Sequence, residues 1–191
     1  MQNNKLGIRK RLIFILAGIA GQFAWCIENM YLNSYIAYLN FNAPTGQGFD
    51  YSLMIAITTA LSAITATITT LLMGTLTDKL NKRKIFISVG YIVWGIATAS
   101  FGLVNVNNEN SLIPISMSAS SAAIMVIVIA CVMTFFGSTS NDAAFNSYVT
   151  RNTPENKRGK VEGVLSILPL IAMLIIFVGL NGLTTKDAGY R

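Results

Sequence analysis

Five long segments of the sequence are almost free of charged residues, and they constrain the fold more strongly than any other feature. The segments cover residues 12–39, 53–77, 85–104, 119–148 and 161–183. Each is long enough for an α-helix to cross the hydrocarbon core of a bilayer, which takes about 20 apolar residues. The sequence therefore predicts an all-α, polytopic membrane protein with five transmembrane helices surrounded by the lipid bilayer.

The composition of the chain agrees with a membrane protein. Apolar residues make up 53% of it and charged residues only 12%, whereas about a quarter of the residues of soluble domains are charged. The net charge of +6 is found in some nucleic-acid-binding proteins, but here the basic residues alternate with the apolar segments instead of forming one basic face. We therefore expect no nucleic-acid partner.

The positions of the basic residues predict the orientation in the membrane. Twelve of the fourteen Lys and Arg residues lie before the first segment, between the second and third, or between the fourth and fifth. The loops 40–52 and 105–118, on the other side, contain none. Because short loops rich in Lys and Arg stay in the cytoplasm, we expect a multi-pass protein of the inner or plasma membrane with a cytoplasmic N-terminus and an external C-terminus.

The sequence lacks the usual residues of catalytic and metal sites. It contains no His, which removes the commonest general base and a frequent zinc ligand. Both cysteines, Cys26 and Cys131, lie inside apolar segments and are expected to be buried thiols, not a disulfide or metal ligands. We expect no enzyme activity, no metal and no cofactor.

The loop after the second segment carries the most specific motif, which reads Gly-Thr-Leu-Thr-Asp-Lys-Leu-Asn-Lys-Arg-Lys over residues 74–84. Gly74 permits close contact with a neighbouring helix, and Asp78 can pair with a basic residue to act as a gate. The motif resembles the signature loop of the major facilitator superfamily, with Asn81 in place of the usual glycine. Asparagine is the next-best residue for the positive φ of a tight turn. The basic residues alone also fit a simpler role as determinants of topology.

A second loop supports the same resemblance. Residues 153–160 read Thr-Pro-Glu-Asn-Lys-Arg-Gly-Lys, which is similar to the Pro-Glu-x-x-Arg-Gly loop between the fourth and fifth helices of many superfamily members. Arg158 is expected to pair with Asp78, because both lie at the cytoplasmic mouth. In the alternative interpretation, Pro154 and Gly159 only punctuate a loop. The expected gate residues are Gly74, Asp78, Lys79, Lys82, Arg83 and Arg158.

Polar residues inside the apolar segments predict a solute site. Acids in hydrocarbon are costly and normally face a cavity or a partner, and the two candidates are Glu28 and Asp142. Gln22 and Asp142 lie about 16 and 14 Å along their helices from the basic flanks, near the midplane, where alternating-access transporters bind solutes. Glu28, about 26 Å along, is expected in the outer half. The candidate solute-binding or proton-coupling residues are Gln22, Trp25, Glu28, Asn29, Asn33, Asn141, Asp142 and Asn146.

Helical spacing groups these candidates. At 100° per residue, Gln22, Asn29 and Asn33 form a polar stripe along the first segment, while Glu28 lies off its edge on the side of Trp25, whose ring can stack on a sugar. In the alternative interpretation, the polar groups only hold helices together. The many small and hydroxylated residues of the second segment predict a helix packed on several sides.

Within the superfamily, the nearest resemblance is to the glycoside-pentoside-hexuronide:cation symporters or related sugar transporters. The residues that carry it are Met-Tyr-Leu at 30–32, Tyr35, Met73, Gly74, Asp142 and Phe145. The resemblance implies that Asp142 is the sugar-binding acid. The family's acid on the first helix falls at Gln22, and its cation-binding acids on the second helix fall at Ala66 and Thr70, which argues against sodium coupling. Proton coupling through Asp142 or Glu28 stays open, because burial favours a neutral carboxyl.

The expected function is secondary active transport of a small polar solute, a sugar or glycoside, by alternating access. The resemblance implies a transporter of 12 spans, so residues 1–191 are expected to be a partial N-terminal half. It would be an inverted 3+3 repeat without its last helix, and the remaining helices would be its partners. The alternatives are a non-transporting five-span interaction protein of the membrane and a truncated pseudogene product.

Overall fold

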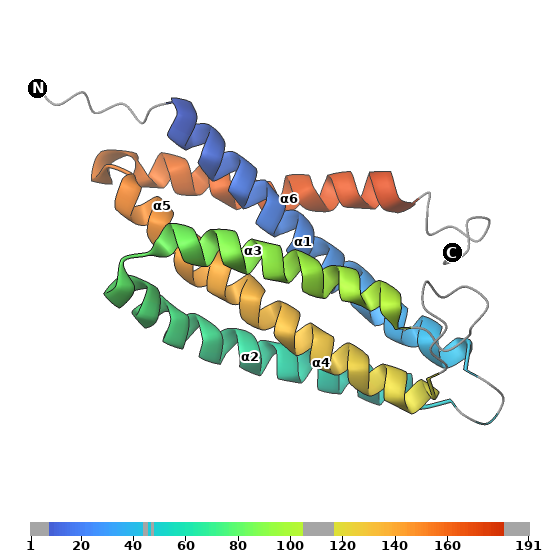
Figure 1. Ribbon diagram of the computed structural model, residues 1–191. Coiled ribbons are helices and arrows are strands. Elements are labelled where there is room, and N and C mark those ends of the chain that lie inside the picture. Colours follow the sequence, from blue (N-terminus) through green and yellow to red (C-terminus); the bar gives the residue numbers. More distant parts are fainter. Residues whose placement is uncertain (1–7, 44–45, 47, 105–116, 182–191) are drawn as a thin grey trace, which may run out of the picture.

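The computed structural model describes residues 8–43, 46, 48–104 and 117–181. Its long helices are α1 (Ile8–Phe41), α2 (Tyr51–Leu80), α3 (Arg83–Ser100), α4 (Ala119–Gly137) and α6 (Arg158–Asn181). A π-helix, η3 (Ser138–Phe145), and the short α5 (Asn146–Asn152) continue α4 without a break (Figure 1). The 3₁₀ turn η1 (Phe101–Leu103) follows α3, and a second one, η4 (Glu155–Lys157), precedes α6.

Five helical rods in this part of the chain are long and apolar enough to cross a membrane. They are α1, α2, α3 with η1, α4 with η3 and α5, and η4 with α6. The predicted all-α class with five apolar helices is therefore confirmed. At the loops rich in Lys and Arg the helices begin before the apolar segments, α1 at Ile8 and α6 at Arg158, because these basic residues are good helix formers.

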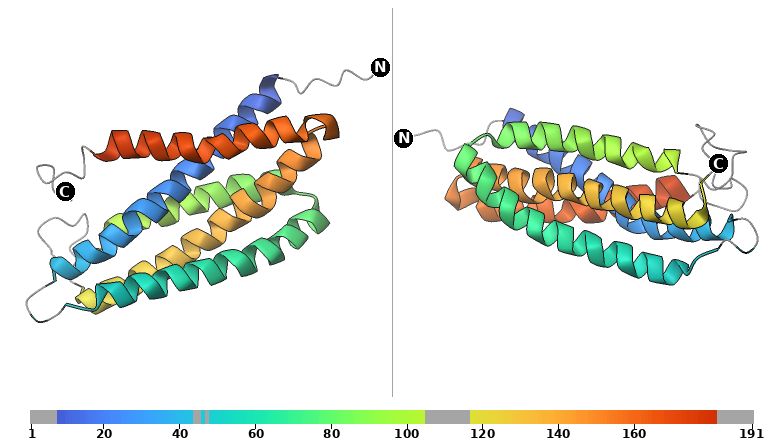
Figure 2. Two further views of the ribbon diagram at one scale, coloured as in Figure 1. Left: turned by 180° about the vertical axis from the view of Figure 1, so that it is seen from behind. Right: turned by 60° about the horizontal axis from the view of Figure 1, so that its bottom comes forward.

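The rods form a bundle in which α4 and η3 hold the central position. Between them they contact α1, α2 and α3. Helix α6 packs along α1, on the side of the bundle away from α2 (Figures 1 and 2). Helix α1 runs obliquely across the bundle, so its two halves face different neighbours.

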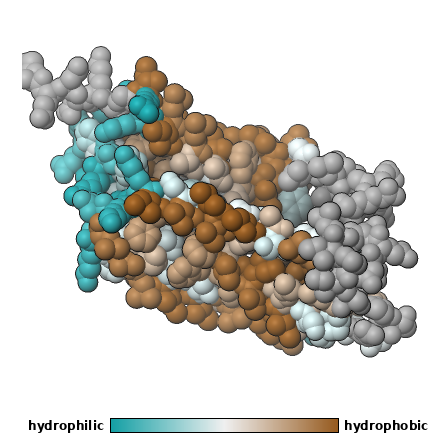
Figure 3. Space-filling view, viewed as in Figure 1, coloured by the Kyte–Doolittle hydropathy of each residue, from teal (hydrophilic) through white to brown (hydrophobic). Residues whose placement is uncertain are grey.

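The loops rich in Lys and Arg lie together at one end of the bundle, which we call the basic end. The α2–α3 link and the α5–α6 link both lie there, near the start of α1 (Figure 1). Figure 3 shows hydrophilic residues gathered at this end and hydrophobic residues over most of the visible side. Four of the most exposed apolar side chains are Leu71, Ile92, Leu170 and Val178. An apolar surface of this extent implies contact with lipid.

Helix α2 is packed on one side only. Near the start of α2, Met54 and Ile55 pack against a buried cluster that includes Ile36 and Leu39 of α1 and Val126 of α4. The fully buried residues of α2 are Thr58, Thr69 and Thr77. The expectation of a second helix packed on several sides is therefore wrong for the described residues, because its other faces carry exposed apolar side chains.

Glycines on the neighbouring helices make room for the π-helix. A Cβ atom at Gly90 of α3 would lie 2.6 Å from the Cβ atom of Ser140, which is fully buried. A Cβ atom at Gly21 of α1 would overlap with the side chain of Asn141. π-helical turns are rare and frequently occur at functional sites. The position of η3 between α1 and α3 thus depends on two residues without side chains.

We predict that Gly90→Ala lowers the free energy of unfolding by about 1–3 kcal/mol, the usual cost of overfilling a tight contact. Gly95→Ala on the same helix is the matched control, because no atom lies within 4 Å of its Cβ position and alanine favours a helix. The measurement is thermal unfolding of the detergent-solubilised protein. Equal unfolding temperatures for the two variants would contradict the packing of η3 against α3.

Candidate functional site

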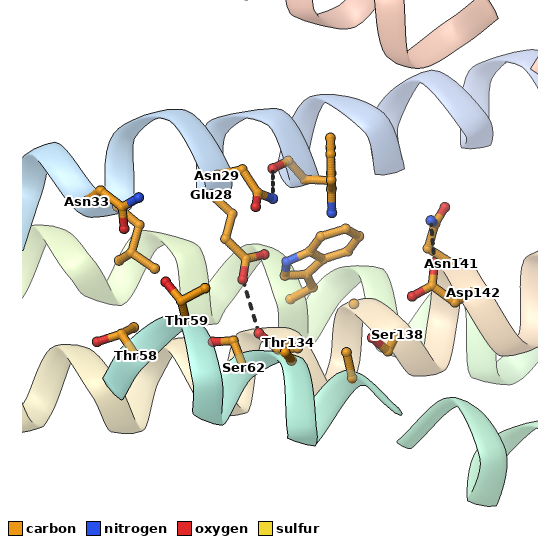
Figure 4. Close-up of a pocket in the computed structure, with 16 residues that line it drawn as sticks. Glu28, Asn29, Asn33, Thr58, Thr59, Ser62, Thr134, Ser138, Asn141 and Asp142 are labelled. Atoms are coloured by element: carbon orange, nitrogen blue, oxygen red, sulfur yellow. Dashed lines mark hydrogen bonds between the residues drawn. The ribbon is translucent and has the colours of Figure 1, made fainter. Parts of the chain in front are cut away.

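A polar cavity of about 290 Å³ lies inside the apolar bundle, between α1, α2 and the α4–η3 helix. Figure 4 shows Glu28 pointing towards Thr134 and Ser62, with Asn141 and Asp142 farther along. We call it the Glu28 cavity. Its polar lining consists of Trp25, Glu28, Asn29, Asn33, Thr58, Thr59, Ser62, Trp94, Thr134, Ser138, Asn141 and Asp142.

A hydrogen bond across the contact between α1 and α4 fixes Glu28. Thr134 Oγ1 donates to Glu28 Oε1 at 3.0 Å, and Thr134 itself is buried. On the same helix as Glu28, Asn29 Nδ2 donates to the backbone carbonyl of Trp25 at 2.8 Å. Trp25 keeps half of its surface exposed, so its ring forms an open part of the cavity wall.

A second polar cavity, of about 430 Å³, lies between α1, η3, α5 and α6 and closer to the basic end. We call it the Glu162 cavity. Its polar lining consists of Gln22, Asn141, Asp142, Asn146, Thr150, Glu162 and Ser166. Among the described residues, neither cavity is lined by Lys or Arg. Both cavities therefore suit a molecule that forms hydrogen bonds and carries no negative charge.

Asn141 and Asp142 belong to both cavities and are held by one hydrogen-bond network. Tyr91 Oη of α3 lies 3.0 Å from the carbonyl oxygen of Ala17 and 3.1 Å from Asn141 Oδ1. Asn141 Nδ2 donates to Asp142 Oδ1 at 3.0 Å. The network joins α1, α3 and η3, and it fixes the two side chains at the place where the cavities meet.

The structure divides the predicted solute-binding residues between the two cavities. Those on the wall of the Glu28 cavity alone are Trp25, Glu28, Asn29 and Asn33, and those on the wall of the Glu162 cavity alone are Gln22 and Asn146. The predicted stripe is therefore not one surface. Because α1 is oblique, Gln22 faces η3 and α6, whereas Asn29 and Asn33 face α2 and α4. Glu28, expected off the edge of the stripe, lies with Asp142 on one cavity wall.

Several hydroxyl and aromatic groups of this site are not apparent as site residues from the sequence. Thr58, Thr59 and Ser62 recur on one face of α2 at helical spacing, a signal that was interpreted as helix packing. Thr134 and Trp94 give no local signal, because only the packing of α4 and α3 brings them to the Glu28 cavity.

At the basic end, a network of polar side chains joins the motif loop to α5. Arg83 is buried, forms an ion pair with Asp78, and donates from Nε to Ser147 Oγ at 2.8 Å. Ser147 Oγ donates to Asp78 Oδ1 at 3.0 Å. Asn81 has the positive φ of 52° that was expected of it, and its Oδ1 accepts from Arg83 and Arg151 at 3.2 and 3.1 Å.

Two expectations about this loop differ from the structure. Asp78 pairs with Arg83 and not with Arg158, whose Nε has no partner among the described residues. The turn at Asn81 brings Arg83 back onto Asp78, while Arg158 begins a different helix. Gly74 makes no close helix contact, since no atom lies within 4 Å of its Cβ position. Two further gate candidates are exposed, Lys79 and Lys82.

Comparison with known families gave one match. A family model described as Major Facilitator Superfamily matches residues 4–177, well over half of the chain. Comparison with curated proteins and with solved structures found no match. In the described part of the chain, no group of three or more Cys, Asp or Glu side chains is placed to hold a metal ion.

We predict that Asp78→Asn lowers the free energy of unfolding, because the buried Arg83 guanidinium loses its counter-ion. Adding Arg83→Gln should recover part of the loss, since no buried charge is then left unpaired. A double-mutant cycle of the two single variants and the double variant, followed by unfolding in detergent, measures their coupling. Strictly additive effects would contradict the ion pair.

Proposed function

Because the chain belongs to the major facilitator superfamily, a family of membrane transporters and not of enzymes, we propose that it serves secondary active transport of a small polar solute. The proposed solute is a sugar or a glycoside. The observation that carries this proposal is the pair of polar cavities that share Asn141 and Asp142 inside an apolar bundle.

The order of the two cavities along the bundle fits alternating access. The Glu28 cavity extends from Asn141 and Asp142 towards the end opposite the basic end, and the Glu162 cavity extends towards the basic end. A solute that moves from one cavity to the other passes the side chains of Asn141 and Asp142. Alternating-access transporters place their binding site near the midplane in this way and expose it to each side in turn.

The chemistry of the cavity walls favours a neutral, hydroxyl-rich solute. Amides, hydroxyls and carboxyls can both donate and accept hydrogen bonds to sugar hydroxyls. The described walls contain two acids in each cavity and no Lys or Arg, which disfavours anions. The half-exposed ring of Trp25 offers an apolar face on which a sugar ring can stack.

We propose protons as the coupling ion. Asp142 and Glu28 are carboxyls within membrane-spanning helices, a position at which acids commonly relay protons in transporters. Ala66 and Thr70 stand where the symporters that the sequence resembles have cation-binding acids, so the proposal does not include sodium.

The network of Asp78, Arg83 and Ser147 is the proposed gate. It joins the α2–α3 loop to α5, which follows directly after the π-helix that carries Asp142. The excess of Lys and Arg at the basic end favours its location in the cytoplasm, at the inner or plasma membrane, together with the N-terminus. Breaking the network would free α2 from α5 beside the Glu162 cavity.

We predict that Asp142→Asn lowers sugar uptake about tenfold or more, the effect of losing one hydrogen bond to a charged group, and that the remaining uptake depends less on pH. The assay follows labelled glucose, galactose, xylose, methyl β-glucoside and lactose into vesicles that contain the full-length protein. Asp50→Asn is the matched control, because Asp50 only caps α2 and asparagine caps equally well. Unchanged uptake and pH dependence in the Asp142 variant would refute its assignment.

We predict that Asp78→Asn lowers the maximal uptake rate and leaves the Kd of the same sugar within about twofold, because the gate acts on the conformational step and not on the bound solute. Uptake and equilibrium binding are measured on the same preparation, below the unfolding temperature of the variant. A normal maximal rate would argue against the gate.

A further inference from the structure

Two buried polar atoms on the wall of the Glu28 cavity have no hydrogen-bond partner. They are Trp94 Nε1 and Ser62 Oγ. In the described part of the chain only four buried side-chain polar atoms lack a partner, so half of them lie at this one cavity. Buried indole N–H groups usually find an acceptor. Their clustering at a cavity indicates that a molecule other than the protein supplies the missing partner.

The indole of Trp94 is held in a fixed position. Its residue is 3% exposed, and its ring atoms lie 3.0–3.3 Å from the Cβ position of Gly137, so the ring lies flat against a residue without a side chain. On another side it stacks with Tyr91, with ring centroids 5.8 Å apart. The N–H group therefore cannot swing away to an acceptor elsewhere.

Glu28 supplies the opposite hydrogen-bonding character to the same corner. Its Oε1 accepts from Thr134 Oγ1 at 3.0 Å, and its other oxygen is free to accept from a ligand. Ser62 Oγ, on α2, can both donate and accept. Figure 4 shows Glu28, Ser62 and Thr134 from three different helices converging on this corner. With Trp94 on the wall of the same cavity, the lining thus offers one fixed donor, one acceptor and one group of both kinds.

We propose that Glu28, Ser62, Trp94 and Thr134 form a subsite for a hydroxyl group of a neutral, polyhydroxylated solute. A hydroxyl oxygen has two lone pairs and can accept from both Trp94 and Ser62 while its hydrogen is donated to Glu28, so one group can satisfy all three open positions. An ammonium group cannot accept from the indole. A carboxylate would place like charge against Glu28. The inference rests on the proposed function, because the ligand of the subsite is the solute that the protein would transport.

The test compares three variants of the subsite with controls that carry the same kind of substitution at positions outside it. Trp94→Phe removes the N–H, Thr134→Val removes the hydroxyl that orients Glu28, and Ser62→Ala is a mild change that keeps the fold. The control for Thr134→Val is Thr139→Val, since that buried hydroxyl bonds its own helix at Phe135 O. The control for Ser62→Ala is Ser100→Ala, whose hydroxyl bonds Ile96 O.

The probe is the sugar of the panel above that the full-length protein takes up fastest, together with its monodeoxy analogues. We expect each corner variant to raise the KM of the parent sugar about tenfold, and the controls to leave it unchanged. One deoxy analogue should bind more weakly than the parent sugar to the wild type. In Trp94→Phe the two should bind equally well, because the missing hydroxyl and the missing N–H remove the same interaction.

The possible outcomes separate this inference from the proposed function. If the wild type takes up sugar and Asp142→Asn abolishes uptake, but the corner variants keep KM within about twofold, the corner holds only water and the inference is wrong. If the wild type takes up no sugar of the panel, the proposed function fails and the inference loses its basis. A KM that rises equally in the corner variants and in their controls also overturns the subsite.

Discussion

Hydrocarbon does not hydrogen-bond, and the arrangement of the bundle depends on this constraint. Leu71, Ile92 and similar residues occupy the outer surface, while Glu28, Asp142 and the polar residues around them line the interior. Exposed hydroxyls such as that of Thr67 bond to the backbone of their own helix. A polar group that turns inwards has to find a protein partner or face a cavity. Glu28 accepts a hydrogen bond from Thr134, and Asn141 bonds with Tyr91. Buried hydroxyls such as that of Thr139 bond to the backbone of their own helix, and other polar groups line the two cavities. The two cavities are therefore the places inside the apolar bundle where polar side chains gather.

The central helix connects the chemistry of the interior to the polar network at the basic end. Between Thr134 and Asp142 the rod contributes to the wall of the Glu28 cavity, and between Asn141 and Thr150 to that of the Glu162 cavity. Ser147, two residues beyond η3, contacts Asp78 and Arg83. Helices α1 and α3 fit against this rod through Gly21 and Gly90. The same backbone that positions the cavity residues thus also positions the partner of the motif loop.

The sequence predicts those features of the structure that one segment determines by itself. Long apolar segments predict helices because each helix satisfies its own backbone, and Asn81 adopts its left-handed turn for local reasons. Contacts between segments were not accessible in the same way. The stripe from Gln22 to Asn33 is split because α1 is oblique, and no local pattern reveals a crossing angle. Asp78 pairs with Arg83 and not with Arg158, an outcome that depends on the geometry of the turn at Asn81.

The number of residues in the π-helix η3 sets the orientation of α5 relative to α4. In η3 the hydrogen bonds span five residues instead of four, so the segment holds more residues than an α-helix of equal height. Losing one codon between Ser138 and Phe145 would leave composition, charge and apolar length nearly unchanged. It would nevertheless rotate everything that follows by about 100°, turning Ser147 and Arg151 away from the α2–α3 loop. A substitution in this stretch alters one side chain, whereas a deletion would change the orientation of every residue after η3 relative to α4.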